Sequence, residues 1–521
     1  MLEKVHKMSE KLCNVTSYKK CTLPKHSNNN ECILHCSKED AMHDYHKSWK
    51  DLDLFQEKLF EYVLESIFAH RKEEDAFNRS VVSAYLHGQK LMNNFIEEKV
   101  KDITIVFNHI AFPVYDGRDE WDYTPLLQRL GKIHFNYCKF HVPWIELLET
   151  EVFFQDCEFY DHWNLQNYEM LQNVDNVIYQ CCDFSEDISC SDIVLKNSQF
   201  KDCKFEGIEL RTTTFEEPLF VNSKSFSGDI SRLILENCTH EKEFVLERIN
   251  IEYFDIDKSI FHGKFEMLKV VVEDMKIMYV HFKDLVECFN CTFREFYVYK
   301  TTYEDFVSFE FSIFGSYDLK ESACTKFEYV TFLSFVNFRS TLFNGGLRLS
   351  RANFKEYPNF LYAEVKSNDT DVETFRIIKH SFDKIGNSTE ANRYFALEMN
   401  KQKKETLFWN DPEKKIILFL NLIFSRYGES YLLPLVWIFI ITILYTLTID
   451  FVQTFTIADI SPKYHLQIED IINDLNGVAK NIIPYKKFLR SGMEFISLIF
   501  LLLYSVFIYH FIVAVKRRTK R

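Results

Sequence analysis

The stretch that decides the fold is residues 195–220, which read LKNSQFKDCKFEGIELRTTTFEEPLF. Large apolar side chains stand at positions 195, 200, 205, 210, 215 and 220, so a five-residue spacing repeats without a break. Polar residues follow each of them, and the position two residues before is often small, as at Ser198, Cys203 and Thr213. A period of five fits neither a helix, at about 3.6 residues per turn, nor a flat strand, at about 2. The spacing predicts a squared coil whose sides each use five residues and bury a continuous ladder of side chains.

Shorter runs of the same spacing occur from Phe135 to Phe354, for example at Phe154–Phe159 and Phe338–Phe343. Cysteine recurs two residues before the large side chain, where it can act as a small hydrophobe. The members of this set are Cys138, Cys157, Cys182 and Cys291. We therefore expect one solenoid over residues 135–365.

These residues resemble the pentapeptide-repeat family, whose pattern is A-[DN]-[LF]-x-x, and Ala352-Asn353-Phe354-Lys355-Glu356 matches that pattern in full. The resemblance implies a right-handed quadrilateral β-helix. The expected fold is thus mostly β plus α, with N-terminal helices before the β-helix, and a helical hairpin and a transmembrane hairpin after it.

Two C-terminal stretches are long and apolar enough to cross a bilayer. They run from Tyr431 to Ile449, without a charge, and from Phe495 to Val515, with His510 as the single ionisable group. A span needs roughly 20 mostly apolar residues. The segment 411–521 is therefore predicted to be a membrane module, with Gly428 and Pro434 marking the entry to the first span.

Basic residues flank both spans. Lys414, Lys415 and Arg426 precede the first, and Lys516, Arg517, Arg518, Lys520 and Arg521 follow the second. The positive-inside rule places both chain ends in the cytosol, with two spans in the inner (plasma) membrane. Five Lys and Arg residues in the connection 450–494 oppose this orientation without reversing it. The charged N-terminus MLEKVHKMSEKLC lacks the apolar region of a signal peptide.

The membrane module also looks like the C-terminal part of some bacterial membrane-associated pentapeptide-repeat proteins. The matching pieces are Ser425-Arg426-Tyr427-Gly428, the element Asn481-Ile482-Ile483-Pro484 and the closing residues 508–518. That module is compared with two-helix ion-channel units, yet nothing in this chain resembles the TVGYG filter of potassium channels.

The remaining segments read as smaller units. Residues 1–48 are predicted to be an irregular tail, and residues 49–134 a cap with helices at Leu52–Ile67 and Glu73–Lys99 and a strand at Ile103–Phe107. A helical hairpin is expected over 371–410. Its first helix carries an apolar stripe, Gly386-Asn387 ends it, and Ser388 caps the second helix. The stripe consists of Phe375, Ile378, Phe382 and Ile385.

Charge limits the function. Residues 1–410 carry 49 Lys and Arg against 67 Asp and Glu, whereas residues 411–521 carry 13 against 9. A body of this acidity does not neutralise phosphates, so nucleic-acid binding is not expected. Phosphate-binding loops, dinucleotide fingerprints, HExxH motifs and nucleophile elbows do not occur in the sequence, and no catalytic residue or cofactor is predicted.

The N-terminal tail contains zinc-ligand types in the order Cys32-x3-Cys36-x6-His43-x2-His46. The gap between the pairs is too short for a zinc finger, and Cys13, Cys21, His26 and His35 offer alternatives. The favoured interpretation is a cysteine-bearing tail without a metal.

The function favoured by the sequence is a non-enzymatic membrane-anchored scaffold that presents an acidic β-helix to a protein partner. One alternative is an oligomeric ion-channel-like or membrane-perturbing effector of bacterial stress or anti-phage defence, gated by the cytosolic body. Its pore-lining candidates are Ser497, Tyr504, Ser505 and His510. The other alternative is a nucleic-acid mimic with a rod-shaped acidic surface.

Overall fold

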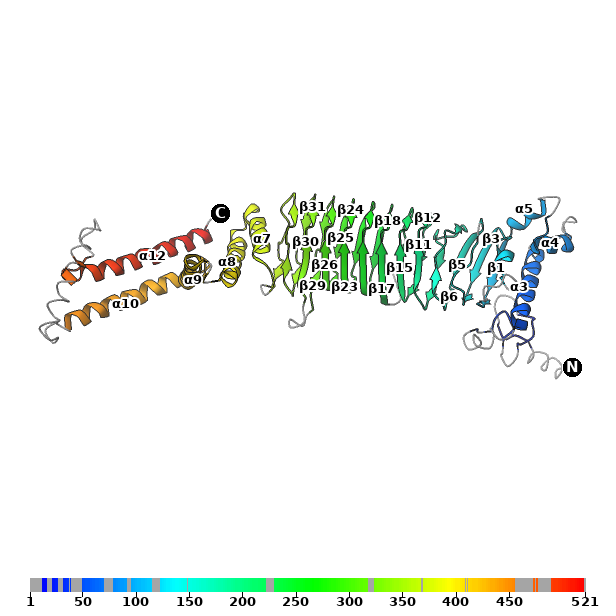
Figure 1. Cartoon of the computed structure of the whole chain (residues 1–521), viewed down its shortest axis with the longest axis horizontal. Coiled ribbons are helices and arrows are strands. Elements are labelled where there is room, and N and C mark those ends of the chain that lie inside the picture. Colours follow the sequence, from blue (N-terminus) through cyan, green and yellow to red (C-terminus); the bar gives the residue numbers. More distant parts are fainter. Residues whose placement is uncertain are drawn as a thin grey trace. The chain divides into compact units, whose positions relative to one another are not determined.

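The structure is a computed structural model (Figure 1) that divides the chain into two units. The first unit is Met1–Gly346 with Arg351–Lys366, and the second is Leu347–Ser350 with Ser367–Arg521. The residues that it describes are 12–15, 21–26, 31–36, 38, 49–69, 78–90, 95–114, 122–147, 149–221, 229–316, 323–366, 369–407, 409, 411–454, 472–473, 475–476 and 489–519.

Helices lie before the solenoid and within its first coil. They are α3 (Trp49–Ala69), α4 (Arg79–Leu86), α5 (Phe95–Lys101) and the short α6 (Thr124–Leu127). The helix predicted over Leu52–Ile67 is confirmed, and its apolar positions Leu52, Phe55, Leu59, Val63 and Ile67 are buried, whereas Tyr62 is half-buried. The prediction of a single helix over Glu73–Lys99 is wrong. Gly88 adopts a left-handed φ of 84° and its N–H bonds to the carbonyl of Tyr85, which ends α4 at Leu86.

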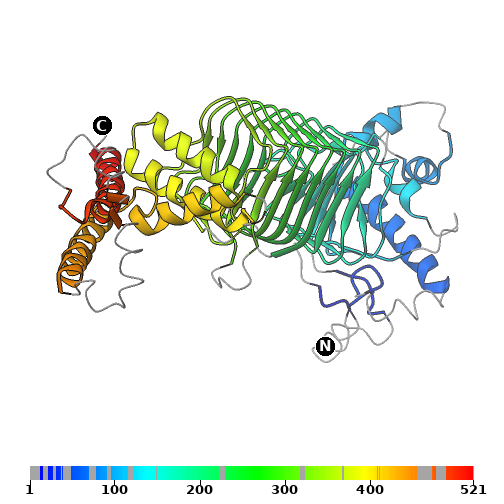
Figure 2. The same ribbon diagram turned by 60° about the vertical axis from the view of Figure 1, so that its left-hand side comes forward.

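The first unit is a parallel β-solenoid of about 10 turns, as the five-residue spacing predicts. Figure 2 shows the strands of successive coils stacked on one another. Coiling begins before residue 135, since Thr104 of β1 pairs with Lys132 of β3.

The strands stack in five parallel sheets. The first two sheets contain β1 (Thr104–Asn108), β3 (Lys132–Asn136), β5 (Glu151–Gln155), β8 (Glu169–Met170), β9 (Tyr179–Gln180) and β13 (Phe200–Lys201), and then β2 (Ala111–Phe112), β4 (Lys139–Phe140), β6 (Glu158–Phe159), β10 (Asp183–Phe184) and β14 (Lys204–Phe205). The third sheet includes β7 (Trp163–Asn164), β11 (Ile188–Ser191), β15 (Gly207–Arg211), β17 (Asp229–Glu236), β20 (Asn250–Asp257), β23 (Val271–Met278), β26 (Thr292–Tyr299), β29 (Ile313–Phe314), β30 (Thr325–Glu328), β33 (Leu342–Phe343) and β36 (Glu364–Val365).

The last two sheets run along the C-terminal coils. One contains β12 (Val194–Leu195), β16 (Thr214–Phe215), β18 (Thr239–His240), β21 (Ile260–Phe261), β24 (His281–Phe282), β27 (Thr302–Tyr303), β31 (Thr331–Phe332) and β35 (Asn353–Phe354). The other contains β19 (Phe244–Glu247), β22 (Phe265–Leu268), β25 (Val286–Phe289), β28 (Val307–Ser308) and β32 (Val336–Asn337).

Pairs of buried side chains, one pair on each side of a coil, explain the five-residue spacing. In the coil of β20 to β22 the buried pairs are Ile249 with Ile251, Phe254 with Ile256, Ser259 with Phe261, and Phe265 with Met267. Val194 faces Thr214, so that coil uses 20 residues. Asn250 faces Val271, so this one uses 21. The extra residue on one side shifts the spacing from coil to coil, which is why the sequence shows it in separated runs.

A left-handed residue turns the chain at a corner of these coils. Asn237, Lys258 and Lys300 have φ values of 54°, 49° and 47° although none is glycine. The next residue is small, and after Asn237 and Lys258 its side chain donates to a carbonyl of the preceding coil: Cys238 Sγ to Leu210 O, and Ser259 Oγ to Leu235 O at 3.2 Å. Small polar side chains at these positions therefore satisfy backbone groups that the corner leaves outside the strand ladders.

Aromatic rings stack along the lumen. Phe140, Phe159 and Phe184 follow one another with centroid separations of 4.9 and 4.4 Å. All six large residues of the 195–220 run are buried, which confirms the ladder inferred from the sequence. Stacked aromatic pairs contribute about 0.5–1.5 kcal/mol each beyond the area that they bury, so the ladder is the main source of cohesion between coils.

The second unit is helical. It contains the short strand β34 (Leu347–Arg348) and the helices α7 (Val372–Lys384), α8 (Ser388–Glu405), α9 (Pro412–Ser425), α10 (Leu432–Thr454) and α12 (Glu494–Thr519). The helical hairpin α7–α8 is as expected, with two corrections. Ile385 is 63% exposed, because it lies at the C-cap of α7 and has left the buried stripe. The side chain of Asn387, not Ser388, caps α8 by accepting a hydrogen bond from Glu390 N.

Candidate functional site

Two helices of the second unit could cross a membrane by length and composition, over Leu432–Ile449 of α10 and Glu494–Arg517 of α12. Large apolar side chains on both helices are exposed, including Phe439, Leu447, Leu502 and Ile512. Such a surface is not stable against water, so it requires lipid or another apolar cover. Gly428 lies in the turn before α10. Pro434 lies in the first turn of α10, where backbone N–H groups have no partner within the helix, so the proline costs the helix no hydrogen bond.

Polar side chains join the two spans within the chain. Tyr445 OH lies 2.9 Å from Ser497 Oγ, and Tyr504 OH donates to Thr442 Oγ1 at 2.8 Å. Ser505 Oγ donates to Leu501 O of its own helix. Hydrogen bonds between membrane helices are worth about 0.6–2 kcal/mol each. Three of the four pore candidates thus already have intrachain partners.

His510, the fourth candidate, packs against α9. Its Nδ1 lies 3.4 Å from Ser425 Oγ, and its ring meets that of Phe424 at 5.6 Å. Trp437 of α10 donates to Ile423 O and stacks on Phe507 of α12. The C-terminal turn of α9 is therefore enclosed by both spans, and His510 serves this packing.

Arg517 joins α12 to the helical hairpin. Its guanidinium lies 4.5 Å from the ring centroid of Phe395 in α8 and donates to Tyr427 O in the turn before α10. Its carbonyl accepts a hydrogen bond from Asn392 Nδ2 at 2.8 Å. A Cβ on Gly428 would stand 2.8 Å from Arg517 Nη1, so only glycine leaves room for this arrangement. The hairpin and the membrane helices are thereby held as one piece.

The solenoid exterior has a strongly acidic part. Residues 151–195 contain ten Asp and Glu and no Lys or Arg. Five of the ten pair with cations of neighbouring coils, as Asp175 does with Lys201 at 2.6 Å and Asp187 does with Arg232. The others have no ion pair within the described part of the chain; they are Asp156, Asp161, Glu169, Glu186 and Asp192. We call these five side chains the unpaired carboxylates.

A second surface feature escaped the sequence analysis. Lys300 lies over the rings of Tyr279 and Tyr299, at 5.5 and 5.2 Å, and Arg351 lies over Tyr329 at 5.0 Å. We call these residues the tyrosine cluster. Tyr279 and Tyr329 are 48% and 42% exposed. Tyrosine and arginine are common at the centres of protein interfaces. The signal was the 21-residue step from Tyr279 to Lys300, which a five-residue pattern does not reveal.

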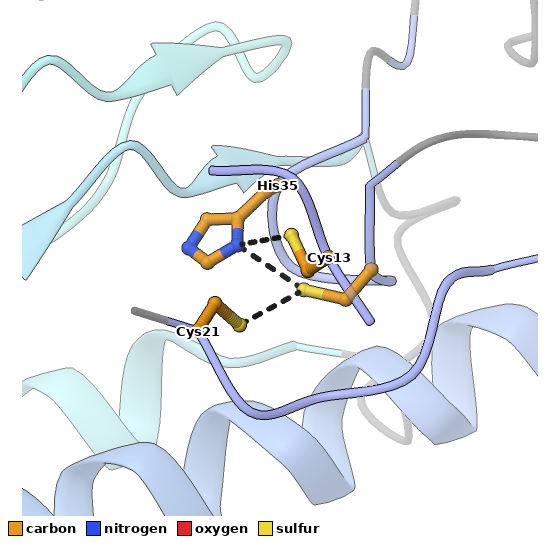
Figure 3. Close-up of side chains that lie close together, drawn as sticks. Cys13, Cys21 and His35 are labelled. Atoms are coloured by element: carbon orange, nitrogen blue, oxygen red, sulfur yellow. Dashed lines mark hydrogen bonds between the residues drawn. The ribbon is translucent and has the colours of Figure 1, made fainter. Parts of the chain in front are cut away.

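The N-terminal segment brings four metal-ligand types together. They are Cys13, Cys21, Cys32 and His35, whose ligand atoms all lie within 4.8 Å of one another (Figure 3). Of the four residues in the predicted zinc pattern, Cys32 alone belongs to this cluster. Cys36 turns away, with its Sγ 3.2 Å from Lys38 Nζ. His43 and His46 lie outside the described residues.

Proximity alters the acidity of the clustered thiols. Burial raises the pKa of Cys13. The hydrogen bond between Cys21 and Cys32 raises the pKa of Cys32 to about 11 and lowers that of Cys21. Backbone hydrogen bonds from Val15 and Leu23 reach Cys13 and Cys21, each from two residues further along the chain.

No protein-family model matches this chain, and no curated protein or solved structure is significantly similar to it. The resemblance to pentapeptide-repeat proteins therefore rests on the repeat residues of the sequence alone. The function has to be argued from the surfaces described above.

Proposed function

We propose that this protein is a non-enzymatic scaffold anchored in the inner (plasma) membrane, which holds a protein partner against its solenoid in the cytosol. The observation that carries the proposal is the group of five unpaired carboxylates. They lie within residues 151–195, which contain ten Asp and Glu and no Lys or Arg, and they create a field that attracts a positively charged surface. Glu169, Glu186 and Asp192 are exposed, so a partner can reach them.

The membrane helices support the anchoring role. Ser497, Tyr504 and His510 bond or pack within their own chain. A pore would need polar side chains facing a shared channel, and two spans per chain would have to oligomerise to form one. The intrachain bridges favour an anchor over an ion-conducting assembly. The basic residues around both spans favour cytosolic chain ends.

The hairpin supplies the connection that a scaffold requires. Asn392 and Phe395 of α8 contact Arg517 at the end of α12. A rigid joint between α8 and α12 would fasten the hairpin, which follows the solenoid directly in the chain, to the anchoring helices.

Site-specific photo-cross-linking tests the proposal. A photoreactive amino acid is placed at Glu186 or Asp192 of the full chain, in membranes of the cells that make it. We expect both positions to capture the same protein, and raised salt to reduce capture because it screens exposed charges. A matched position is Lys269, on a later coil, where capture should be absent.

Charge neutralisation completes the test. Asp156→Asn, Glu186→Gln and Asp192→Asn together should abolish capture through a photoreactive group at Glu169 while the protein stays in the membrane. Capture that survives both the triple variant and high salt would contradict the proposal. Cross-links that join only copies of this chain, together with ion currents from the purified oligomer that His510→Leu changes, would support the channel alternative instead. Capture of a nucleic-acid-binding enzyme would favour mimicry.

A further inference from the structure

The four side chains of the N-terminal cluster are brought together by specific backbone contacts. Leu12 and Pro24 form an antiparallel bridge, and Cys13 N donates to Leu23 O at 3.1 Å, so the segments of Cys13 and Cys21 lie side by side. A turn over 32–36, in which His35 N and Cys36 N donate to Cys32 O, directs Cys32 and His35 to one point.

The distances within the cluster match the shell of a tetrahedral metal. Cys21 Sγ lies 3.9 Å from Cys32 Sγ, and His35 Nδ1 lies 3.4 and 3.2 Å from the Sγ atoms of Cys13 and Cys32. A tetrahedral zinc ion with Zn–S of about 2.3 Å and Zn–N of about 2.0 Å holds neighbouring ligand atoms about 3.5–3.8 Å apart. The widest pairs in the cluster, within 4.8 Å, need to close by about 1 Å to meet this geometry.

We propose that Cys13, Cys21, Cys32 and His35 bind one structural Zn²⁺ ion. Three thiolates and an imidazole are a ligand set that zinc prefers, and tetrahedral sulfur-rich sites favour it over calcium, magnesium or manganese. Four protein ligands leave no open position, which is typical of structural rather than catalytic zinc.

The other cysteines of the chain show what packing alone produces. In the solenoid, Cys138 Sγ donates to Phe107 O and Cys157 Sγ to Phe135 O, so these thiols satisfy backbone carbonyls. In the cluster, Cys32 and Cys13 instead direct their sulfur atoms at His35 Nδ1. A disulfide does not account for the pair Cys21–Cys32 either, because bonded sulfur atoms stand about 2.05 Å apart.

The segment also needs a staple. Among its described residues, Ile33 and Leu34 are the only buried aliphatic side chains. That is too little apolar surface to order so polar a chain, and small modules of this kind usually depend on disulfides or metals. Ala111 of β2 donates to Leu34 O at 2.9 Å, so the segment lies on the first strand of its sheet. Zinc would therefore fix this segment beside the first coil, where Phe55 of α3 also packs on Phe112 of β2, as part of the cap that repeat proteins require at their ends.

The test is the metal content of the full chain, purified in detergent without chelators. We expect about one zinc per chain, and loss of at least four-fifths of it in Cys21→Ser and in Cys32→Ser. The matched control is Cys36→Ser, a buried cysteine of the same turn whose hydroxyl can keep the contact to Lys38; it should retain the zinc. Wild-type protein that contains no zinc and takes up neither Zn²⁺ nor Co²⁺ after reduction would overturn the proposal, as would zinc that remains in Cys21→Ser.

A second pair of measurements covers variants that lose the fold of the segment. Co²⁺ in place of zinc should show the intense visible bands of a tetrahedral site with sulfur ligands. His35→Cys should still bind the metal and shift these bands, because a fourth thiolate replaces the imidazole, whereas His35→Ala should lower affinity. Octahedral Co²⁺ spectra, or identical spectra in wild type and His35→Cys, would contradict the assignment. Chelation should also expose residues 12–36 to protease in wild type, and leave the cleavage of Cys32→Ser unchanged.

Discussion

His240 stacks face to face on Phe261 of the next coil, with ring centroids 4.6 Å apart and ring planes 2° from parallel. Phe215 covers the opposite face at 4.5 Å, so an imidazole occupies one rung of an aromatic ladder. His240 is 2% exposed, and its Nε2 has no hydrogen-bond partner among the described residues. Burial lowers the pKa of His240 to about 3.

This burial predicts an acid-sensitive solenoid. The unfolded chain binds a proton at His240 below about pH 6.5, whereas the folded chain binds it only near pH 3, so stability falls as the pH drops between these values. The loss is about 1.4 kcal/mol per pH unit, or about 2 kcal/mol at pH 5. His240→Phe should remove this loss and raise the melting temperature more at pH 5 than at pH 7.5. The control is the exposed His162→Gln. A melting difference that is the same at both pH values would contradict the prediction.

Phe205→Asp should unfold the solenoid. Phe205 is buried and stacks edge-on against Phe200 at 4.9 Å, so a carboxylate at this position would lose its water and gain no cation, at a cost of several kcal/mol. Circular dichroism and protease resistance of the full protein measure the effect. Lys204→Asp introduces the same charge one residue earlier, at an exposed position, and should melt within a few degrees of the parent. Equal melting of the two variants would mean that the ladder is not a core.

Gly428→Ala should loosen the joint between α8 and α12. The new methyl group would meet Arg517 Nη1 at 2.8 Å, in addition to the strain of a left-handed φ of 84°. Gly492→Ala is the matched control, because Gly492 has a φ of 81° and no atom within 4 Å of its Cβ position. Hydrogen exchange of α8 in detergent should speed up in the first variant only. Equal exchange in both would show that backbone strain, not Arg517, governs this helix.

Helix α9 should contact lipid. Its exposed side chains include Ile416, Ile417 and Phe419, while Lys414 and Lys415 stand at its N-terminal end, as in helices that lie in a membrane interface. A photoreactive phospholipid in reconstituted vesicles should label α9 as well as α10, and should leave α7 unlabelled. Labelling of α10 without α9 would mean that protein covers this face of α9.

The tyrosine cluster should contribute to partner binding independently of charge. Tyr279→Ala with Tyr329→Ala removes exposed rings that lie under Lys300 and Arg351. We expect these two substitutions together to speed dissociation of the partner that cross-linking identifies, without altering the salt dependence of binding. Neutralising the unpaired carboxylates should instead weaken that salt dependence. A change in salt dependence alone in the tyrosine variant would be contrary to this division.

Local patterns were sufficient wherever each residue's environment repeats. The spacing of 195–220 predicts the buried ladder, because every coil presents the same inward positions to its neighbours. The apolar runs predict α10 and α12, because a membrane span depends on length and composition alone. Helix ends were less predictable. The left-handed turn at Gly88 divided an expected helix, and Asn387 took the capping role expected of Ser388.

The cysteine cluster and the tyrosine cluster were decided by tertiary structure. Cys13, Cys21 and Cys32 are separated by seven and ten residues, a spacing without a recognisable rule, and they meet because Leu12 pairs with Pro24 and the 32–36 turn faces that bridge. Tyr279, Lys300 and Tyr329 meet because coils of 21 residues and more place one corner above the next. Sequence patterns encode periods along one chain, whereas both of these groups depend on distances between strands that the chain leaves and returns to.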